Sequence, residues 1–262
     1  SGCQESNNTN NWENTSCWNI TGTEDDAVGY PNTTNESVKI LDDHTIELNG
    51  FSPSIGKLTM SATSNISEIV FSGSETLVAT GDVDFGSLGR IDGPGAVLRL
   101  EGGTQILSTG FLPISRLETA SGLTLQLASN VEVTDLVAEG SSNTSGLTLS
   151  DGSGTGSTLT IGGVNTDIQG LLSVGSGITV STNVNLSVAG DVNVDGTINS
   201  NGNNITASGD ELFISSTGSV NLGANGGATL TLNGADLINE GGVDLRGSSV
   251  IANGGDVSNS NA

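Results

Sequence analysis

The sequence predicts an all-β fold in which short strands coil around a thin core, a parallel β-solenoid. The clearest observation is the stretch NVNLSVAGDVNVDGTINSNGNN, residues 183–204. From Val184 to Ile198 every even position is apolar or glycine, and every odd position except Ala189 is polar. A period of two is the period of a β-strand, so the even positions are expected to line a core.

Repeats near the C-terminus give the size of one coil. The last 35 residues divide into the seven-residue units ATLTLNG, ADLINEG, GVDLRGS, SVIANGG and DVSNSNA. Seven residues correspond to about one strand and one corner. Three units would make a triangular coil of roughly 21 residues, and residues 170–190 and 191–210 have a similar length. We expect about 11 such coils.

Composition agrees with a thin core. Glycine contributes 39 residues, while aromatic residues make up 3% and hydrophobic residues 34% of the chain. A round core filled by large rings is therefore not expected. Low hydrophobicity with high charge also occurs in disordered chains, but the strict alternation argues against disorder.

Glycine and proline mark the corners. Gly190 and Gly196 are predicted to be bends between successive faces, and glycine is expected there because it tolerates positive φ. Pro53, Pro94 and Pro113 are expected in loops or corners, since an interior strand needs every backbone N–H.

The chain is predicted to be one domain, with an N-terminal cap segment at residues 1–36 and the β-helix at 37–262. The cap holds both cysteines, Cys3 and Cys17. In a chain rich in Ser, Thr and Asn, with no second thiol pair or neighbouring histidine, these two residues are expected to form a disulfide that pins the first loop. Closing this loop would contribute about 3 kcal/mol.

Sequons and the absence of a membrane-length apolar run predict an exported, extracellular or cell-surface protein. Of nine Asn-X-Ser/Thr sequons, five lie in the first 35 residues and are candidate N-glycosylation sites: Asn7, Asn14, Asn19, Asn32 and Asn35.

Charge narrows the range of partners. The formal net charge is −23, with 29 acidic residues against 6 basic ones. Such a surface repels phosphate backbones and anionic lipids, so we expect neither nucleic-acid binding nor membrane insertion. The charge can also serve only to keep a β-rich rod soluble.

The segment WNITGTEDDAVGYPNTTNESVKILDDHTIELNG, from Trp18 to Gly50, resembles the opening of many secreted pectin-lyase-like β-helix proteins. The shared elements are a Trp, a polar loop with Gly and Pro, a V-x-I pattern at Val38 and Ile40, and a turn into Thr45–Leu48. The resemblance implies a right-handed parallel β-helix. It implies little about activity, because this architecture carries lyases, hydrolases, adhesins and fibre subunits alike.

Catalysis by paired carboxylates is a weak alternative. The sequence NTD at 165–167 resembles one element of a hydrolytic site, but no later Asp-Asp pair, Gly-His-Gly or Arg-X-Lys follows it. The pairs Asp25–Asp26 and Asp42–Asp43 lie beside each other, and neighbouring residues on a strand point to opposite faces. The only histidine, His44, lies in a turn-like segment. We therefore expect no catalytic residues.

Further segments of the sequence suit two binding activities, for Ca²⁺ and for ice. Carboxylates beside glycine in GDVDFG (81–86), GDVNVDG (190–196) and GGDVSNSN (254–261) could bind Ca²⁺, although solvated corner aspartates explain them equally. Outward pairs Thr158/Thr160 and Thr229/Thr231 suit an ice-binding face. The pairs Asn185/Ser187 and Asn193/Asp195 interrupt this pattern and argue against it.

The sequence therefore predicts a structural protein that assembles into an extracellular filament or layer. The expected contact is head-to-tail, between the open strand edges at the ends of the solenoid, so the principal partner is another copy of the chain. A monomeric adhesin or carbohydrate-binding β-helix is the alternative, with glycans or other surface proteins as partners. A polysaccharide lyase or hydrolase comes third.

Overall fold

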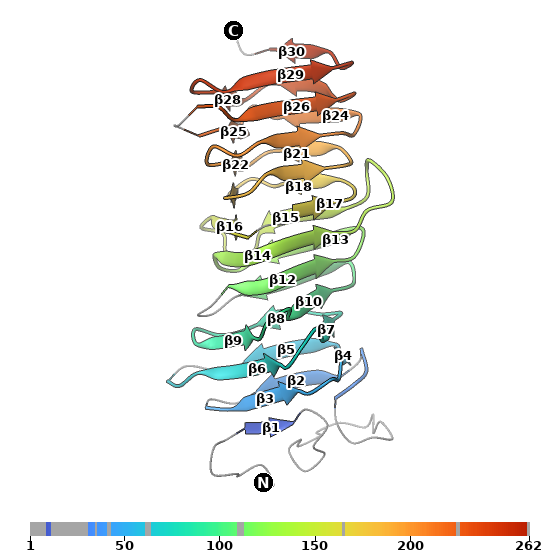
Figure 1. Ribbon diagram of the computed structural model, residues 1–262, viewed down its shortest axis with the longest axis vertical. Coiled ribbons are helices and arrows are strands. Elements are labelled where there is room, and N and C mark those ends of the chain that lie inside the picture. The colour runs from blue at the N-terminus through green and yellow to red at the C-terminus, as the bar shows by residue number, and fades with distance from the viewer. Residues whose placement is uncertain are drawn as a thin grey trace.

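A computed structural model describes residues 9–11, 31–34, 36–40, 43–60, 64–108, 113–163, 166–223 and 226–260. Figure 1 shows a single rod in which the chain climbs from one end to the other. The fold is a right-handed parallel β-solenoid of about 10 turns with about 21 residues per turn, and the described residues contain no helix. The predicted all-β solenoid is confirmed, with about 10 turns where about 11 were expected, and the cysteines of the predicted disulfide cap lie outside the described residues.

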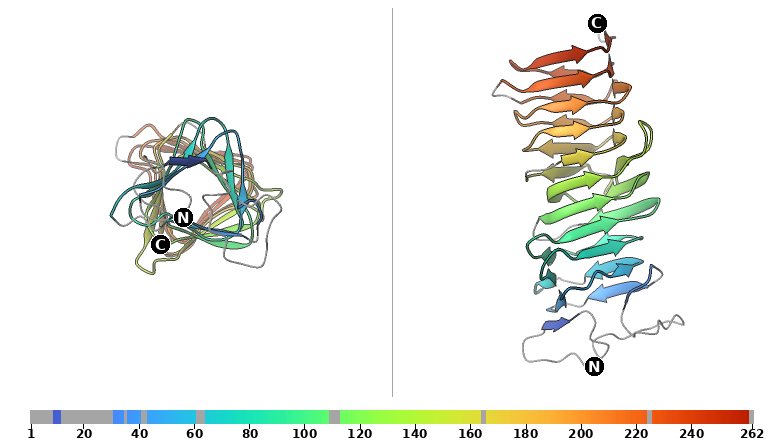
Figure 2. Two further views of the ribbon diagram at one scale, coloured as in Figure 1. Left: turned by 90° about the horizontal axis from the view of Figure 1, so that it is seen from below. Right: turned by 45° about the vertical axis from the view of Figure 1, so that its right-hand side comes forward.

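Each regular turn contributes three strands, one to each side of the rod, and the turns superpose when seen along the axis (Figure 2). All of the described strand ladders are parallel. In each regular turn the chain passes through side 1, then side 2, then side 3. The first regular strand of the rod lies on side 3.

Side 3 is one sheet of 11 strands that follows the whole rod. Its strands are β2 (Ser37–Ile40), β5 (Lys57–Met60), β8 (Val83–Asp84), β11 (Thr104–Ser108), β13 (Leu123–Leu127), β15 (Leu147–Asp151), β18 (Leu172–Val174), β21 (Val192–Val194), β24 (Glu211–Ile214), β27 (Asp236–Asn239) and β30 (Val257–Asn259).

Side 1 begins as a four-stranded sheet at the N-terminal end and continues as one arm of a 15-stranded sheet. The first sheet contains β1 (Thr9–Asn11), β3 (Thr45–Leu48), β6 (Ser67–Phe71) and β9 (Gly89–Asp92). The arm contains β16 (Ser157–Ile161), β19 (Ile178–Thr182), β22 (Thr197–Asn199), β25 (Ser219–Asn221) and β28 (Gly242–Asp244).

Side 2 is the remainder of the 15-stranded sheet. Its strands are β4 (Ser54–Ile55), β7 (Thr76–Ala79), β10 (Val97–Leu100), β12 (Ile114–Thr119), β17 (Thr166–Ile168), β20 (Leu186–Val188), β23 (Ile205–Ala207), β26 (Thr229–Asn233) and β29 (Ser249–Asn253). The long strand β14 (Val131–Ala138) pairs with both β16 and β17, so it belongs to sides 1 and 2.

The alternation of residues 183–204 maps onto the sides as predicted. Leu186 and Val188 are buried on side 2, Val192 and Val194 on side 3, and Ile198 on side 1. The core is a narrow apolar column that runs the length of the rod. The C-terminal seven-residue units are also confirmed, because the five units contain β26, β27, β28, β29 and β30 in turn.

Glycine corners have a different cause from the one expected. Gly190 and Gly196 do bend the chain between sides, but neither has a positive φ. A Cβ atom on Gly190 would lie 2.4 Å from the carbonyl carbon of Gly170, and one on Gly196 would lie 2.3 Å from the oxygen of Ile178. Close stacking of backbone on backbone, not dihedral freedom, therefore requires glycine here.

The corners also absorb differences in turn length. Leu172, Val192 and Leu212 stack in consecutive turns with 20 residues between partners, whereas Leu58 stacks on Val83 with 25. Pro53, Pro94 and Pro113 all lie between strands, as predicted. β1 pairs with β3, so the strand ladder of side 1 already begins within the segment predicted as a cap.

Candidate functional site

A cluster of charged side chains lies on the outer surface of side 2, near the middle of the rod. The backbone ladder places Arg99 of β10 beside Glu118 of β12, and Glu118 beside Val137 of β14. Because successive residues of a strand point to opposite faces, these side chains point outward while Leu98 and Leu117 fill the core.

Arg99 is the centre of the cluster. Its Nη1 and Nη2 atoms lie 2.8 and 3.0 Å from the two carboxylate oxygens of Glu139, a bidentate pair. Its Nε donates to Glu101 at 2.6 Å, and Nη1 lies 3.4 Å from Glu118. The hydrogen bonds to Glu139 and Glu101 raise the pKa of Arg99. The bond from Arg99 lowers the pKa of Glu139, so this carboxylate stays ionised and cannot act as a general acid near neutral pH.

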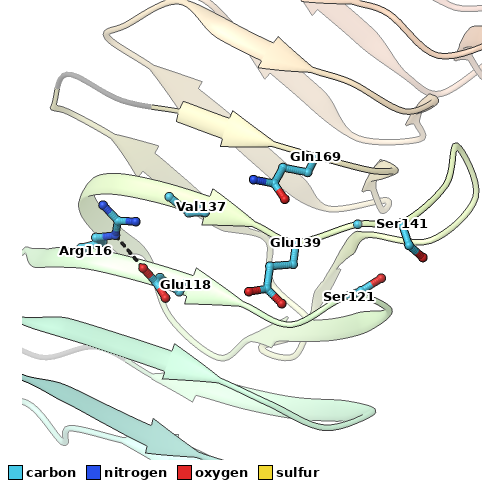
Figure 3. Close-up of a pocket in the computed structure, with 8 residues that line it drawn as sticks. Arg116, Glu118, Ser121, Val137, Glu139, Ser141 and Gln169 are labelled. Carbon is cyan, nitrogen blue, oxygen red and sulfur yellow. Dashed lines mark hydrogen bonds and ion pairs between the residues drawn. The ribbon is translucent and has the colours of Figure 1, made fainter. Parts of the chain in front are cut away.

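An open groove of about 400 Å³ adjoins this cluster (Figure 3). Figure 3 shows Arg116 and Glu118 on one side of the groove and Glu139 and Gln169 nearer the other, with an Arg116 Nε–Glu118 contact of 2.8 Å. The remaining lining residues are Ser121, Val137, Gly140 and Ser141. The groove therefore brings hydroxyl, amide, carboxylate and guanidinium groups together on the surface of a β-sheet. Such groups can hydrogen-bond a polar ligand.

The C-terminal turn is a second candidate site. Val243, Val250 and Val257 lie above the core on sides 1, 2 and 3, where each stacks on an apolar residue of the turn before. Val257 is 58% exposed, whereas Leu237 and Leu212 beneath it in the same column are 5% and 1% exposed. Val243 and Val250 are partly buried. The described rod thus presents an apolar, three-sided surface at this end.

Most residues predicted as sites fall outside the described ranges. These are Cys3, Cys17, Asn7, Asn14, Asn19 and Asn35. Asn32 is described and is half-exposed, and the backbone N–H groups of Asn32 and Thr33 each donate to the Glu36 carboxylate at 2.7 Å. The disulfide and the glycosylation of these asparagines remain predictions.

The carboxylates considered for catalysis are not brought together by the described structure. Asp167 is exposed on side 2, while Asp43 and His44 lie in a turn before β3 near the N-terminal end. Asp25, Asp26, Asp42 and Asn165 lie outside the described residues.

Three of the five aspartates in the segments predicted as possible Ca²⁺ ligands have structural partners. Asp82 accepts the N–H of Ile106 and lies 3.5 Å from the Lys57 ammonium, Asp84 accepts the N–H of Gly86, and Asp191 accepts those of Asp210 and Glu211. Within the described ranges, no group of three or more His, Cys, Asp or Glu side chains is placed to hold a metal ion.

Sequence reasoning missed the cluster around Arg99. Arg99 and Glu139 are 40 residues apart, and two turns of the solenoid separate them. The available signal was the concentration of arginines at Arg90, Arg99 and Arg116, which on a chain of net charge −23 must each attract carboxylates from neighbouring turns.

Comparison with known proteins assigns no family. No protein-family model, curated protein or solved structure matches this chain. The part of the chain that the structure describes has no helix that is long and apolar enough to cross a membrane.

Proposed function

We propose that this protein is an extracellular structural subunit that assembles end to end through the edges of its solenoid. The observation that carries the proposal is the exposure of Val257 above a column whose next two members are buried. A second solenoid stacked on β28, β29 and β30 would bury this valine and pair the backbone groups of the three strands.

A second copy of the chain fits this surface for two reasons. First, the strands of a second copy have the same direction and spacing as those of the last turn, and its cross-section has the same three sides. The parallel ladder of each side would therefore continue across the contact. Second, the side-3 strands near the two ends carry opposite charges: both lysines, Lys39 and Lys57, lie in β2 and β5, while Asp236 lies in β27 and Asp256 directly before β30. This contrast is confined to side 3, since Glu36 and Glu47 also lie in the first turns. A head-to-tail contact of this kind propagates and does not close.

The test is the concentration dependence of the assembly state of residues 1–262. Sedimentation velocity and light scattering should show growing linear oligomers, and electron microscopy should show filaments one rod wide. Val257→Asp should abolish growth while leaving the fold intact, because Val257 is already more than half exposed in a single chain.

Ile106→Asp is the matched control. Ile106 is also apolar and is 40% exposed, but it lies on side 3 away from the ends. This variant should assemble normally. A chain that stays monomeric at high concentration, or one whose growth is stopped equally by both substitutions, contradicts end-to-end assembly.

The groove on side 2 favours a second function, a carbohydrate-binding rod of adhesin type. Its lining of Arg116, Glu118, Glu139 and Gln169 with two serine hydroxyls is suited to sugar hydroxyl groups. The resemblance to secreted pectin-lyase-like proteins fits the same reading, and a lyase or hydrolase remains the third proposal. A glycan array compared between the native chain and Gln169→Ala would test binding.

A further inference from the structure

The outward surface of side 1 in four consecutive turns carries only hydroxyl and amide side chains. We call this surface, on β16, β19, β22 and β25, the hydroxyl face. Its residues form one column of Thr158, Thr179, Thr197 and Ser219, and a second column of Thr160, Ser181, Asn199 and Asn221.

In the sequence, the pairs Asn185/Ser187 and Asn193/Asp195 argued against a regular array of outward threonines. The structure shows that this objection does not apply. Asn185 and Ser187 lie at β20 on side 2, and Asn193 lies in β21 on side 3. They therefore do not interrupt the pair Thr158/Thr160. In the sequence these pairs look like broken repeats of one motif, because each turn passes through three sides before it returns to side 1.

The hydroxyl face is regular, because its residues stack in register from turn to turn. All of its residues are half-buried, which means that the side chains pack against their neighbours in the ladder and none stands clear of the surface. Neighbouring strands lie ~4.8 Å apart, and outward residues of one strand lie ~7 Å apart.

Hydrogen bonds along the ladder hold several of these side chains in fixed directions. Thr197 Oγ1 and Ser219 Oγ are 3.1 Å apart, and Asn221 donates to Asn199 at 2.8 Å. Asn201, at the adjoining corner, donates to the Ser181 hydroxyl at 3.0 Å.

Charge is excluded from the hydroxyl face although the chain has a net charge of −23. Glu132 and Asp244 border its second column, one in the turn before and one in the turn after. In the same turns the other sides do carry carboxylates, with Asp167 on side 2 and Asp191 and Glu211 on side 3. Hence the outward strand residues of side 1 are uncharged in all four turns, whereas side 2 carries Asp167 in β17 and is uncharged in β20, β23 and β26.

We propose that the hydroxyl face binds ordered water at the surface of an ice crystal. The ligand must itself repeat in two dimensions at the spacing of the strands and of alternate residues, and both spacings are close to oxygen repeats on ice surfaces. Ionic groups hold hydration shells that do not fit an ice lattice, which agrees with their exclusion. A crystalline polysaccharide is the competing periodic ligand, but the face carries no aromatic ring to stack on sugars.

The test uses the full chain and two matched substitutions. Thr179→Tyr places a bulky ring in the middle of the hydroxyl face, and Thr206→Tyr places the same ring on the outward surface of β23 on side 2. Both threonines are half-buried and point outward, and tyrosine suits a strand at either position. Circular dichroism and melting temperature check that both variants fold.

Adsorption to a growing ice surface, inhibition of ice recrystallisation, and retention on microcrystalline cellulose are measured for each protein. The native chain and Thr206→Tyr should adsorb to ice, and folded Thr179→Tyr should lose adsorption. If Thr179→Tyr does not fold, Thr197→Ala serves instead and should weaken adsorption. Failure of the native chain to adsorb, equal adsorption of all variants, or retention on cellulose without adsorption to ice overturns the proposal. End-to-end assembly does not enter this test, because the hydroxyl face is lateral.

Discussion

The N-terminal and C-terminal halves of the rod solve the same packing problem with different residues. In the first turns the core contains Met60, Phe71 and Phe85, and ion pairs centred on Arg90 and Arg99 link the outer ladders. From β15 onward, Val, Leu and Ile fill the core, and amide ladders such as Asn199–Asn221 take the place of most ion pairs.

Corners differ in the same way. In the N-terminal half Glu75 ties together two successive corners by accepting from the Ser72 hydroxyl at 2.6 Å, the Gly73 N–H at 2.7 Å and the Gly50 N–H at 2.9 Å. In the C-terminal half Gly170, Gly190 and Gly209 stack backbone on backbone. The comparison teaches that a solenoid corner can be held either by a buried carboxylate or by the removal of side chains.

The largest expected effect concerns the core that both halves share. Val188→Asp or Val192→Asp buries an unpaired charge at a position no more than 1% exposed, and should lower the free energy of unfolding by more than about 4 kcal/mol. Asn193→Asp, on the outer surface of side 3 beside Val192, should change it by less than about 0.5 kcal/mol. Urea unfolding followed by circular dichroism measures both. Equal losses would contradict the inward and outward assignment.

Glycine stacking gives the next largest effect. Gly190→Ala should cost about 2–3 kcal/mol, because the added Cβ would overlap the backbone of Gly170. Gly103, in the N-terminal half, has no positive φ and nothing within 4 Å of an added Cβ, so Gly103→Ala should be nearly neutral. The melting temperatures of the two variants make the comparison. If Gly190→Ala melts like the native chain, backbone stacking does not explain this corner.

Acid should weaken the N-terminal corner held by Glu75. Burial alone would raise the pKa of this carboxyl, but the hydrogen bonds from Ser72, Gly50 and Gly73 outweigh it and lower the pKa to about 2. The ordinary value is 4.5, so this stabilisation is fully present above about pH 4.5 and is lost as the pH falls towards 2.

The Glu75→Gln variant isolates this contribution. We expect it to be less stable than the native chain by about 2 kcal/mol at pH 6, a figure reduced for solvent screening, and by much less at pH 2. Denaturant titrations at the two pH values test this. A difference that does not shrink in acid would contradict the assignment of this carboxylate.

The smallest expected losses of stability distinguish the contribution of an ion pair from that of an amide ladder. Arg99→Gln should cost about 1–2 kcal/mol at low salt and less at 1 M NaCl, since the bidentate pair with Glu139 is partly exposed and screened. Asn199→Ala should cost about 0.5–1 kcal/mol at either salt concentration, because its ladder bond to Asn221 is uncharged. Thermal melts at both salt concentrations distinguish them, and an identical salt response would remove the contrast between the halves.

The sequence was sufficient for the repeating unit and for the direction of its side chains. The alternation around Val188 and the seven-residue units near the C-terminus both correspond to strands of the structure, because a period of two and a fixed corner length are local properties. The prolines were also placed correctly, since their missing N–H excludes them from interior strands by local chemistry alone.

Properties that depend on stacking could not be read from the sequence. The reason for Gly190 is the backbone of Gly170, one turn away, and no local pattern reports that distance. The pairing of Arg99 with Glu139 and the assembly of Thr158, Thr179 and Thr197 into one surface depend on the number of residues in every intervening corner. Those numbers vary from turn to turn, so an error in one corner moves all later residues to the wrong side.

The parallel ladders also determine how the rod bears a load. Hydrogen bonds between turns run along its axis, so a lengthwise pull acts on all the turns in series and the joint with the fewest bonds sets the strength of the whole. Among the described pairings, β17 and β20 share only the pair Ile168–Val188, and β8 contributes only Val83 and Asp84 to its contacts with β5 and β11. Under tension the rod should therefore yield first at one of these two levels, and it would lengthen by uncoiling a turn before any covalent bond is strained.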